Sequence, residues 1–144
     1  MAARFLLDTN VLSEPLRQRP DPTVLDHLRR TSSVLATAAP VWHELLFGCY
    51  RLPISHKRRG IEKYLLEVVR AGIDVLPYDE RAAAWHGTER ARLASCAKTP
   101  PFVDGQIAAI AAVNGLVLVT FNVADFADFD GLAVEDWRSP KHPK

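Results

Sequence analysis

Features that define several protein classes are scarce in this sequence of 144 residues. Its two cysteines, Cys49 and Cys96, form no CxxC pair and have no matching His/Cys set, so no zinc site is expected and both are interpreted as core or surface thiols. No apolar run reaches membrane-spanning length, and the N-terminal MAARFLLDTN lacks the apolar stretch of a signal peptide. We therefore expect a cytoplasmic protein without a membrane partner.

The sequence also lacks an excess of charge of either sign. Its formal net charge is +1, so any nucleic-acid surface has to be a local basic patch. It contains no internal repeat and no Gly/Ser linker, and its hydrophobic content of 48% is typical of a soluble globular protein with a real core. We expect a single domain over residues 1–138 and a short C-terminal tail, 139–144.

Short apolar runs alternate with longer amphipathic segments. The pattern predicts helices at 9–18, 21–31, 40–52, 55–72 and 80–98, a helix within 100–115 that begins near Asp104, and strands at 4–8, 32–39, 73–79, 116–122 and 132–137. Strands separated by helices predict an α/β fold with a parallel sheet and helices on both faces. The all-apolar LVLV agrees, because strands covered on both faces do not alternate.

Acidic side chains recur where these predicted elements meet. Asp8 ends the first strand, Glu44 borders the apolar face of the helix after the second strand, Asp104 begins an apolar helix, and Asn122 and Asp125 follow the fourth strand. Ligands of such folds bind outside the carboxyl ends of the strands. Because each element meets the sheet on the same side, we expect these groups to converge on one edge.

Carboxylates that converge in this way raise each other's pKa unless they are protonated or bind a hard divalent cation. Oxygen ligands suit Mg²⁺ or Mn²⁺, so the sequence predicts a site for one or two such ions. Taken singly, each acid also has an ordinary interpretation. Asp8 or Asp104 can cap a helix, which contributes about 1 kcal/mol, Glu44 can be a solvated helix residue, and Asp125 can be a turn acid.

Several segments match one known family in type and order. LLDTNVLSE, ELLFG, VDGQIAAIA, LVTFNVADF and GLAVEDW resemble the PIN-domain ribonucleases, specifically the VapC-type toxins of toxin–antitoxin pairs, with the FitB-like branch also similar. The resemblance extends from Leu6 to Trp137. It implies a single PIN domain whose central parallel sheet has about five strands in the order 3-2-1-4-5, with helices on both faces.

The resemblance also implies roles for individual residues. By position it makes Asp8, Glu44 and Asp104 metal ligands, and it assigns the fourth role jointly to Asn122 and Asp125. Asp125 is the favoured carboxylate ligand, and all five residues are candidate catalytic residues. The groups expected to orient the ligands from behind are Thr9, Asn10 and Thr120.

The sequence departs from the family pattern at two positions. Phe121 precedes Asn122 where the family usually has a basic residue, typically arginine. The phosphate contact that such an arginine would make must therefore come from another residue or be absent. His43 precedes Glu44 where a small or hydroxyl residue is commoner. Two interpretations of His43 stay open, a substrate contact and a partly exposed helix histidine.

The activity that the resemblance implies is hydrolysis of RNA phosphodiester bonds by a metal-activated water. RNA is repelled by an acidic cluster unless basic side chains lie beside it. Contacts between such side chains and the RNA phosphates give an affinity that depends on salt. These cations also fit a solvated helix face that glutamates balance. The candidate RNA contacts are Arg51, Lys57, Arg58, Arg59, Arg90 and Arg92.

Partners follow from the same resemblance. It implies a VapB-like antitoxin whose tail crosses the acidic edge, a homodimer, and a hetero-oligomer with the antitoxin that reaches DNA only through the antitoxin. A catalytically silent PIN-fold module within a DNA-bound repressor is the alternative function. Aspartyl-phosphate chemistry is disfavoured, because Asn10 stands where that chemistry needs a second acid.

Overall fold

Five parallel strands form one sheet in the computed structural model, which describes residues 2–140. Their order, β3-β2-β1-β4-β5, confirms the predicted α/β fold and the strand order 3-2-1-4-5. The strands are shorter than the predicted segments. They are β1 (Phe5–Leu7), β2 (Leu35–Ala38), β3 (Asp74–Leu76), β4 (Val117–Val119) and β5 (Val134–Glu135).

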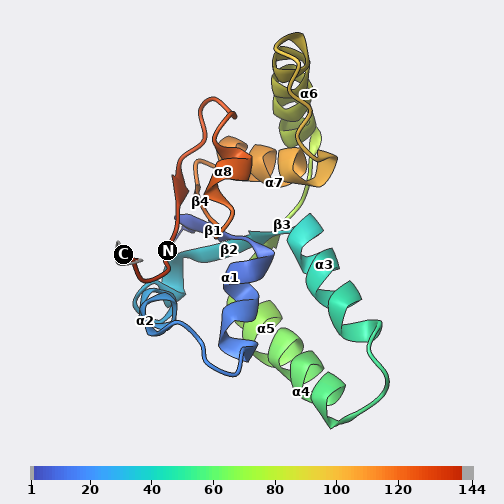
Figure 1. Cartoon of the computed structure of the whole chain (residues 1–144), viewed down its shortest axis with the longest axis vertical. Helices are drawn as coiled ribbons and strands as arrows, with labels where there is room; N and C mark the ends of the chain where they lie inside the picture. Colours follow the sequence, from blue (N-terminus) through green and yellow to red (C-terminus); the bar gives the residue numbers. More distant parts are fainter. Residues whose placement is uncertain (1, 141–144) are drawn as a thin grey trace, which may run out of the picture.

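Helices lie on both sides of this sheet. In Figure 1, α7 and α8 lie above the strands, α1, α4 and α5 lie below them, and α6 projects away from the rest of the molecule. Within residues 2–140, no helix is both long enough and apolar enough to cross a bilayer. The helices are α1 (Thr9–Ser13), α2 (Pro22–Arg30), α3 (Ala39–Tyr50), α4 (His56–Tyr64), α5 (Arg70–Gly72), α6 (Glu80–Ser95), α7 (Phe102–Val113) and α8 (Val123–Phe126).

Three of the predicted helices differ in detail. The helix predicted at 9–18 ends early and continues as a 3-10 turn, Glu14–Leu16, because Pro15 cannot continue an α-helix. The helix predicted at 55–72 contains a π-helical stretch, Leu65–Val69, between α4 and α5. The third, α7, begins before Asp104, at Phe102. A 3-10 turn at Ser32–Val34 and the short helix α8 were not predicted.

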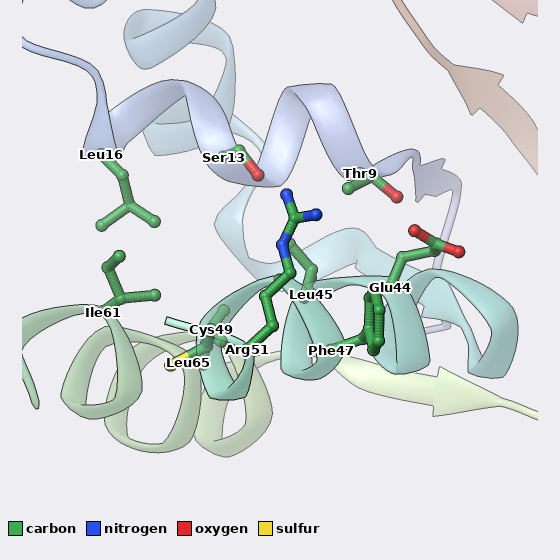
Figure 2. A pocket seen from close by; sticks show the side chains of 11 residues that line it. Thr9, Ser13, Leu16, Glu44, Leu45, Phe47, Cys49, Arg51, Ile61 and Leu65 are labelled. Atoms are coloured by element: carbon green, nitrogen blue, oxygen red, sulfur yellow. The ribbon is translucent and has the colours of Figure 1, made fainter. Parts of the chain in front are cut away.

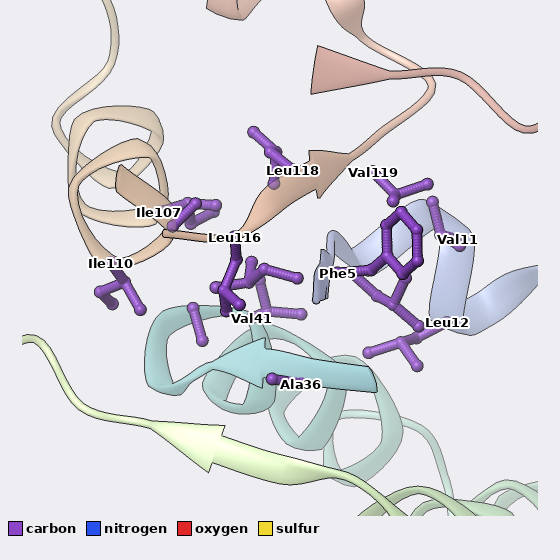
Figure 3. Packing of buried hydrophobic residues seen from close by; sticks show 14 of the residues in the cluster. Phe5, Val11, Leu12, Ala36, Val41, Ile107, Ile110, Leu116, Leu118 and Val119 are labelled. Atoms are coloured by element: carbon purple, nitrogen blue, oxygen red, sulfur yellow. The ribbon is translucent and has the colours of Figure 1, made fainter. Parts of the chain in front are cut away.

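The core fills the space between the sheet and the helices on either side. Leu6 of β1 and Leu118 of β4 are fully buried, as expected for strands covered on both faces. Burying one leucine side chain contributes about 1.5 to 3 kcal/mol, so these strands are firmly held. Figure 3 shows the packing partners from the helices, which include Val11, Leu12, Val41, Ile107 and Ile110.

Strand register brings the carboxyl ends of β1 and β4 to the same edge. Leu7 pairs with Val119 in the ladder, and the N–H of Asp8 donates to the Val119 carbonyl oxygen at 2.9 Å. The residues that follow these strands, Asp8 and Thr120, are therefore neighbours. This edge is where the sequence places its candidate site.

The C-terminal segment docks against α2. Trp137 stacks on His27 of α2 with ring centroids 4.8 Å apart, and the Ser139 N–H and hydroxyl both donate to the Asp21 carboxylate. Part of the predicted tail is thus attached to the domain. Residues 141–144 of that tail lie outside the described residues.

Helix α7 ends in a Schellman motif that leads directly into β4. Gly115 has φ +66°, its N–H donates to the Ala112 carbonyl, and the Leu116 N–H donates to the Ala111 carbonyl. A side chain in this left-handed conformation is strained. Gly87 in α6 differs, since a Cβ added there meets nothing within 4 Å.

The same substitution should therefore have opposite effects at these two glycines. We expect Gly115→Ala to lower the free energy of unfolding by about 1 to 2 kcal/mol, because alanine is strained at positive φ. We expect Gly87→Ala to raise it by about 0.5 to 1 kcal/mol, because alanine is the better helix former. Urea unfolding followed by circular dichroism measures both, and equal effects at the two positions would contradict the assignment.

Candidate functional site

Asp8 is a buried carboxylate with a fixed orientation at the end of β1. Asp8 is 8% exposed to solvent. One carboxylate oxygen accepts the Thr9 N–H at 2.8 Å, and the other accepts the Thr120 hydroxyl at 2.8 Å. Burial raises the pKa of Asp8, nearby Asp125 raises it further, and the two hydrogen bonds only partly offset these effects. The negative charge of Asp8 is therefore disfavoured unless a cation lies close to it.

The groups behind Asp8 tie β1 to β4. The Thr120 hydroxyl, fully buried, donates to Asp8 and accepts the Asn122 N–H at 3.1 Å. The Asn10 side-chain oxygen accepts the Phe121 N–H at 3.3 Å, so Asn10 holds the end of β4 rather than the Asp8 carboxylate. Of the three residues predicted to orient the ligands, Thr120 bonds Asp8 through its side chain and Thr9 through its backbone.

Asp104 occupies the first turn of α7 and is partly buried. Burial raises the pKa of Asp104 to about 6, and repulsion from Asp125 and Asp8 contributes to the shift. The three aspartates therefore lie within electrostatic reach of one another. The N-cap of α7 is Pro101, so Asp104 is not the cap of this helix. Asp8, in contrast, does cap α1 while it lines the site.

These elements enclose a cavity of about 430 Å³ at the sheet edge. Glu44 reaches it from the exposed side of α3, and Asn122 reaches it from the segment after β4. Asp125, in α8, lies beside this cavity, which we call the acidic pocket. The residues that line it are Asp8, Thr9, Asn10, Glu44, Val103, Asp104, Ile107 and Asn122.

The fit of this pocket to a divalent cation depends on its donor chemistry. As the side chains stand, no three acidic, histidine or cysteine side chains within residues 2–140 are close enough together to hold one metal ion. Mg²⁺, however, keeps several waters and needs only one or two carboxylates. Asp8 and Asp104 fit this requirement, because they share one pocket and repel each other, and Glu44 and Asn122 add oxygen donors to the same lining.

A second hollow adjoins the acidic pocket, since Thr9 and Glu44 line both. It lies between α1 and α3, and Figure 2 shows the Arg51 side chain extending from the end of α3 toward Ser13 of α1. The Arg51 guanidinium lies 5.8 Å from the centre of the exposed Phe47 ring. We call the two adjoining hollows together the α1–α3 groove. Its lining is acidic at Asp8 and Glu44 and has the cationic Arg51 side chain beyond Glu44.

Four of the predicted RNA contacts are exposed to solvent. Arg51 lines the α1–α3 groove, and Lys57 and Arg59 are exposed on α4. Arg90 is exposed on α6, where its guanidinium lies 5.2 Å from the centre of the Phe102 ring at the start of α7. Arg51 is thus the predicted contact that the structure places beside the acidic pocket.

The other two predicted RNA contacts already have partners within the chain. Arg92 forms a two-pronged pair with Glu89 at 2.8 and 2.9 Å and lies 3.4 Å from Asp130. Arg58 donates to the Leu52 carbonyl oxygen at 3.0 Å. Both hold loops in place. The Glu89 pair fits the solvated helix face that glutamates balance, whereas the contact with Asp130 depends on how a distant loop folds back.

An arginine does lie beside Phe121, although not in the position expected from the family pattern. The Arg138 guanidinium lies 4.8 Å from the centre of the Phe121 ring and donates to the Phe121 carbonyl oxygen. Arg138 is also paired with Asp136 at 2.7 Å. His43 is exposed on α3, as the second interpretation of this residue expects. Arg138 was missed because its contact with β4 depends on how the C-terminal segment folds back.

Comparison with known proteins gives one consistent family. Residues 5–132 match the PIN domain family. A relative from Shigella flexneri, tRNA(fMet)-specific endonuclease VapC, is 29% identical over 134 residues, which cover 93% of this chain and 98% of the relative. Toxin FitB from Neisseria gonorrhoeae is 30% identical over 140 residues, which cover 92% of this chain and 98% of that protein.

Solved structures agree with these sequence matches. The structure of FitAB bound to a DNA fragment superposes with a TM-score of 0.86 at 28% identity, covering 96% of this chain and 99% of that one. DNA-bound VapBC from Salmonella typhimurium gives a TM-score of 0.81 at 28% identity, covering 94% and 98%. The chain is therefore similar to these proteins over nearly its full described length.

The raised pKa of Asp104 predicts how the free energy of unfolding of the metal-free protein depends on pH. Folding raises this pKa from 3.8 to about 6, so the folded protein binds more protons than the unfolded chain in that range. Stability should consequently fall as the pH rises through this window and stay lower above it. After allowing for partial solvent screening, we expect Asp104→Asn to stabilise the metal-free protein by about 1 to 2 kcal/mol at pH 7.

Urea unfolding at several pH values in the presence of EDTA measures this effect. The gain should shrink as the pH falls from about 6 toward 4 and vanish well below the unfolded value of 3.8, where Asp104 is protonated in both states. Asp74→Asn, at an exposed position in β3, is the matched control and should change little. A variant of Asp104 that is no more stable than the parent at pH 7 would contradict the electrostatic account of the acidic pocket.

Proposed function

The chain belongs to the PIN-domain family, and on that premise we propose that it is a metal-dependent endoribonuclease serving as the toxin of a toxin–antitoxin pair. The observation that carries the proposal is the convergence of Asp8, Glu44, Asp104 and Asn122 on one pocket at the carboxyl edge of β1 and β4. The names of relatives support it, since two of them are called endonuclease VapC and Ribonuclease VapC2.

We infer that the acidic pocket holds one or two Mg²⁺ or Mn²⁺ ions. Asp8 and Asp104 are the principal ligands, with Glu44 and Asn122 beside them and Asp125 adding negative charge. A bound ion lowers the pKa of a coordinated water and neutralises charge on the scissile phosphate. Thr120 keeps the Asp8 carboxylate in one orientation throughout, because its hydroxyl donates to Asp8 at 2.8 Å.

We propose that RNA reaches the pocket along the α1–α3 groove. Arg51 supplies a cation next to the pocket, and the exposed Lys57 and Arg59 of α4 extend the positive charge. These contacts are to phosphates, so they give affinity that depends on salt and carries no sequence information. The exposed ring of Phe47, in the lining of the same groove, offers a face on which a base can stack.

The proposed partners are an antitoxin of the VapB type and a second copy of the chain. Solved relatives named FitAB and VapBC are toxin–antitoxin complexes bound to DNA, which supports a hetero-oligomer that reaches DNA through the antitoxin. For the homodimer we propose the face that includes the exposed Tyr50 and Ile54. The proposed place of action is the cytoplasm, where RNA and such a partner are both present.

The first test removes one carboxylate charge. We expect Asp8→Asn to lower RNA cleavage by more than about 100-fold and to abolish Mn²⁺ binding, because a ligand should matter more than the groups that orient it. Gel analysis of RNA cleavage and calorimetric Mn²⁺ titration measure the two effects, with Asp74→Asn as the control. Antitoxin binding should persist. If the parent protein cleaves no RNA and binds no Mn²⁺, the silent-module alternative stands instead.

The second test concerns the groove. We expect Arg51→Ala, in the non-cleaving Asp8→Asn background, to reduce the slope of log affinity against log salt by about 0.7, because one phosphate contact is lost. Arg81→Ala is the matched control, since Arg81 contacts Val113 and Asn114 at the far end of α7 from Asp104. Filter binding of a labelled single-stranded RNA at several salt concentrations measures the slopes. Identical slopes for the two variants would exclude the α1–α3 groove as the RNA path.

A further inference from the structure

A buried histidine that the proposed chemistry does not use lies at the centre of α6. His86 is 3% exposed, and its Nδ1 lies 2.8 Å from the Tyr78 hydroxyl oxygen. Tyr78 stands in the segment between β3 and α6, so this hydrogen bond ties the ring to the end of the sheet. Burial and the nearby Arg90 both lower the pKa of His86, which keeps the ring neutral. The ring therefore has a fixed orientation.

The face of this ring lies directly on the backbone of α7. A Cβ added at Gly105 would lie 2.1 Å from Nε2 of His86, 2.6 Å from Cδ2 and 2.9 Å from Cε1. All three nearest atoms belong to one imidazole ring, so no side chain fits at Gly105 unless that ring turns away or the two helices move apart. Among the glycines of residues 2–140, Gly105 is the only one at which an added Cβ meets any atom within 4 Å.

The two contacts of the ring with α7 bracket Asp104. On one side of Asp104 in the chain is Gly105, and on the other is Phe102, whose ring centroid lies 4.8 Å from that of His86. Asp104 itself faces the acidic pocket, whereas Phe102 and Gly105 do not line it. His86 thus contacts the first turn of α7 on the side away from the acidic pocket. Asp104, the third residue of α7, borders the pocket.

We propose that His86, oriented by Tyr78 and seated on Gly105, is a positioning residue that sets where the Asp104 carboxylate lies in the metal pocket. This inference rests on the proposed function as a metal-dependent nuclease. Its physical basis is that metal and catalytic constellations tolerate displacements of only about 0.5 Å. A displacement of about 1 Å far from the chemistry can lower the rate roughly 100-fold.

A steric swap tests the proposal on the full-length protein. Gly105→Ala adds a methyl group where the ring lies, His86→Ala removes the ring, and the double variant has room for the methyl group. We expect Gly105→Ala to lower kcat about 30- to 100-fold and to weaken Mn²⁺ binding about 10-fold, with KM for RNA nearly unchanged. The double variant should recover at least about 10-fold of the lost kcat relative to Gly105→Ala.

Two further variants separate positioning from general stability. Tyr78→Phe keeps the packing volume and removes only the hydrogen bond to His86, so we expect it to weaken Mn²⁺ binding and lower kcat about 3- to 10-fold, with Tm lowered by only a few degrees. It also keeps the test decisive if Gly105→Ala does not fold. Gly87→Ala is the matched control next to His86 and should leave kcat and Mn²⁺ affinity unchanged, because its added Cβ meets open space.

The outcomes are distinguishable. Recovery in the double variant, together with the Tyr78→Phe effect in protein that is fully folded at the assay temperature, supports the proposal. Parental Mn²⁺ affinity and kcat in both Gly105→Ala and Tyr78→Phe would overturn it, as would losses that merely follow the fraction of unfolded protein. If the parent protein cleaves no RNA, the proposed function fails, and the Mn²⁺ affinities of the same variants still decide whether His86 positions Asp104.

Discussion

The repulsion among carboxylates that folding buries at one sheet edge is the constraint on which the rest of this structure depends. Asp8 is almost completely removed from water, and Asp104 approaches it closely enough for each charge to disfavour the other. Hydrogen bonds from Thr120 and the Thr9 backbone hold Asp8 without neutralising it. We propose that a divalent cation makes this arrangement favourable, because such an ion would offset both negative charges at once.

The scaffold around these charges serves to keep them together. Parallel pairing of β1 with β4 places Asp8 beside Thr120, and the apolar side chains of α7 anchor Asp104 against the sheet. The His86 ring presses on the same helix from the other side. Stability and site geometry therefore oppose each other at this edge, since the folding energy of the core is used to hold like charges near one another.

The part of this arrangement that the sequence could predict is the part that local patterns encode. An apolar run ending at Asp8 indicated a strand with an acid at its carboxyl end, and alternation of strands with helices indicated the parallel sheet. The strand order came from the family resemblance and is confirmed. The start of α7 was placed too late, because Pro101 was not recognised as the residue that precedes the helix.

What the sequence could not predict depends on contacts between distant residues. The contact of Arg92 with Asp130, the contact of Arg138 with Phe121 and the packing of His86 against Gly105 all depend on how elements pack. These contacts depend on the direction of each side chain, which the hydrophobic periodicity of a sequence does not indicate. The connection of the two hollows through Thr9 and Glu44 has the same origin, since it depends on the angle between α1 and α3.

The central claim is that Asp8 and Asp104 share one divalent cation. Anomalous diffraction at the manganese edge, from crystals of the protein soaked in Mn²⁺, tests this directly. The account predicts an anomalous peak within ligand distance of both carboxylates, roughly 2.0 to 2.2 Å from their oxygens. Full manganese occupancy elsewhere with no peak between Asp8 and Asp104 would contradict it.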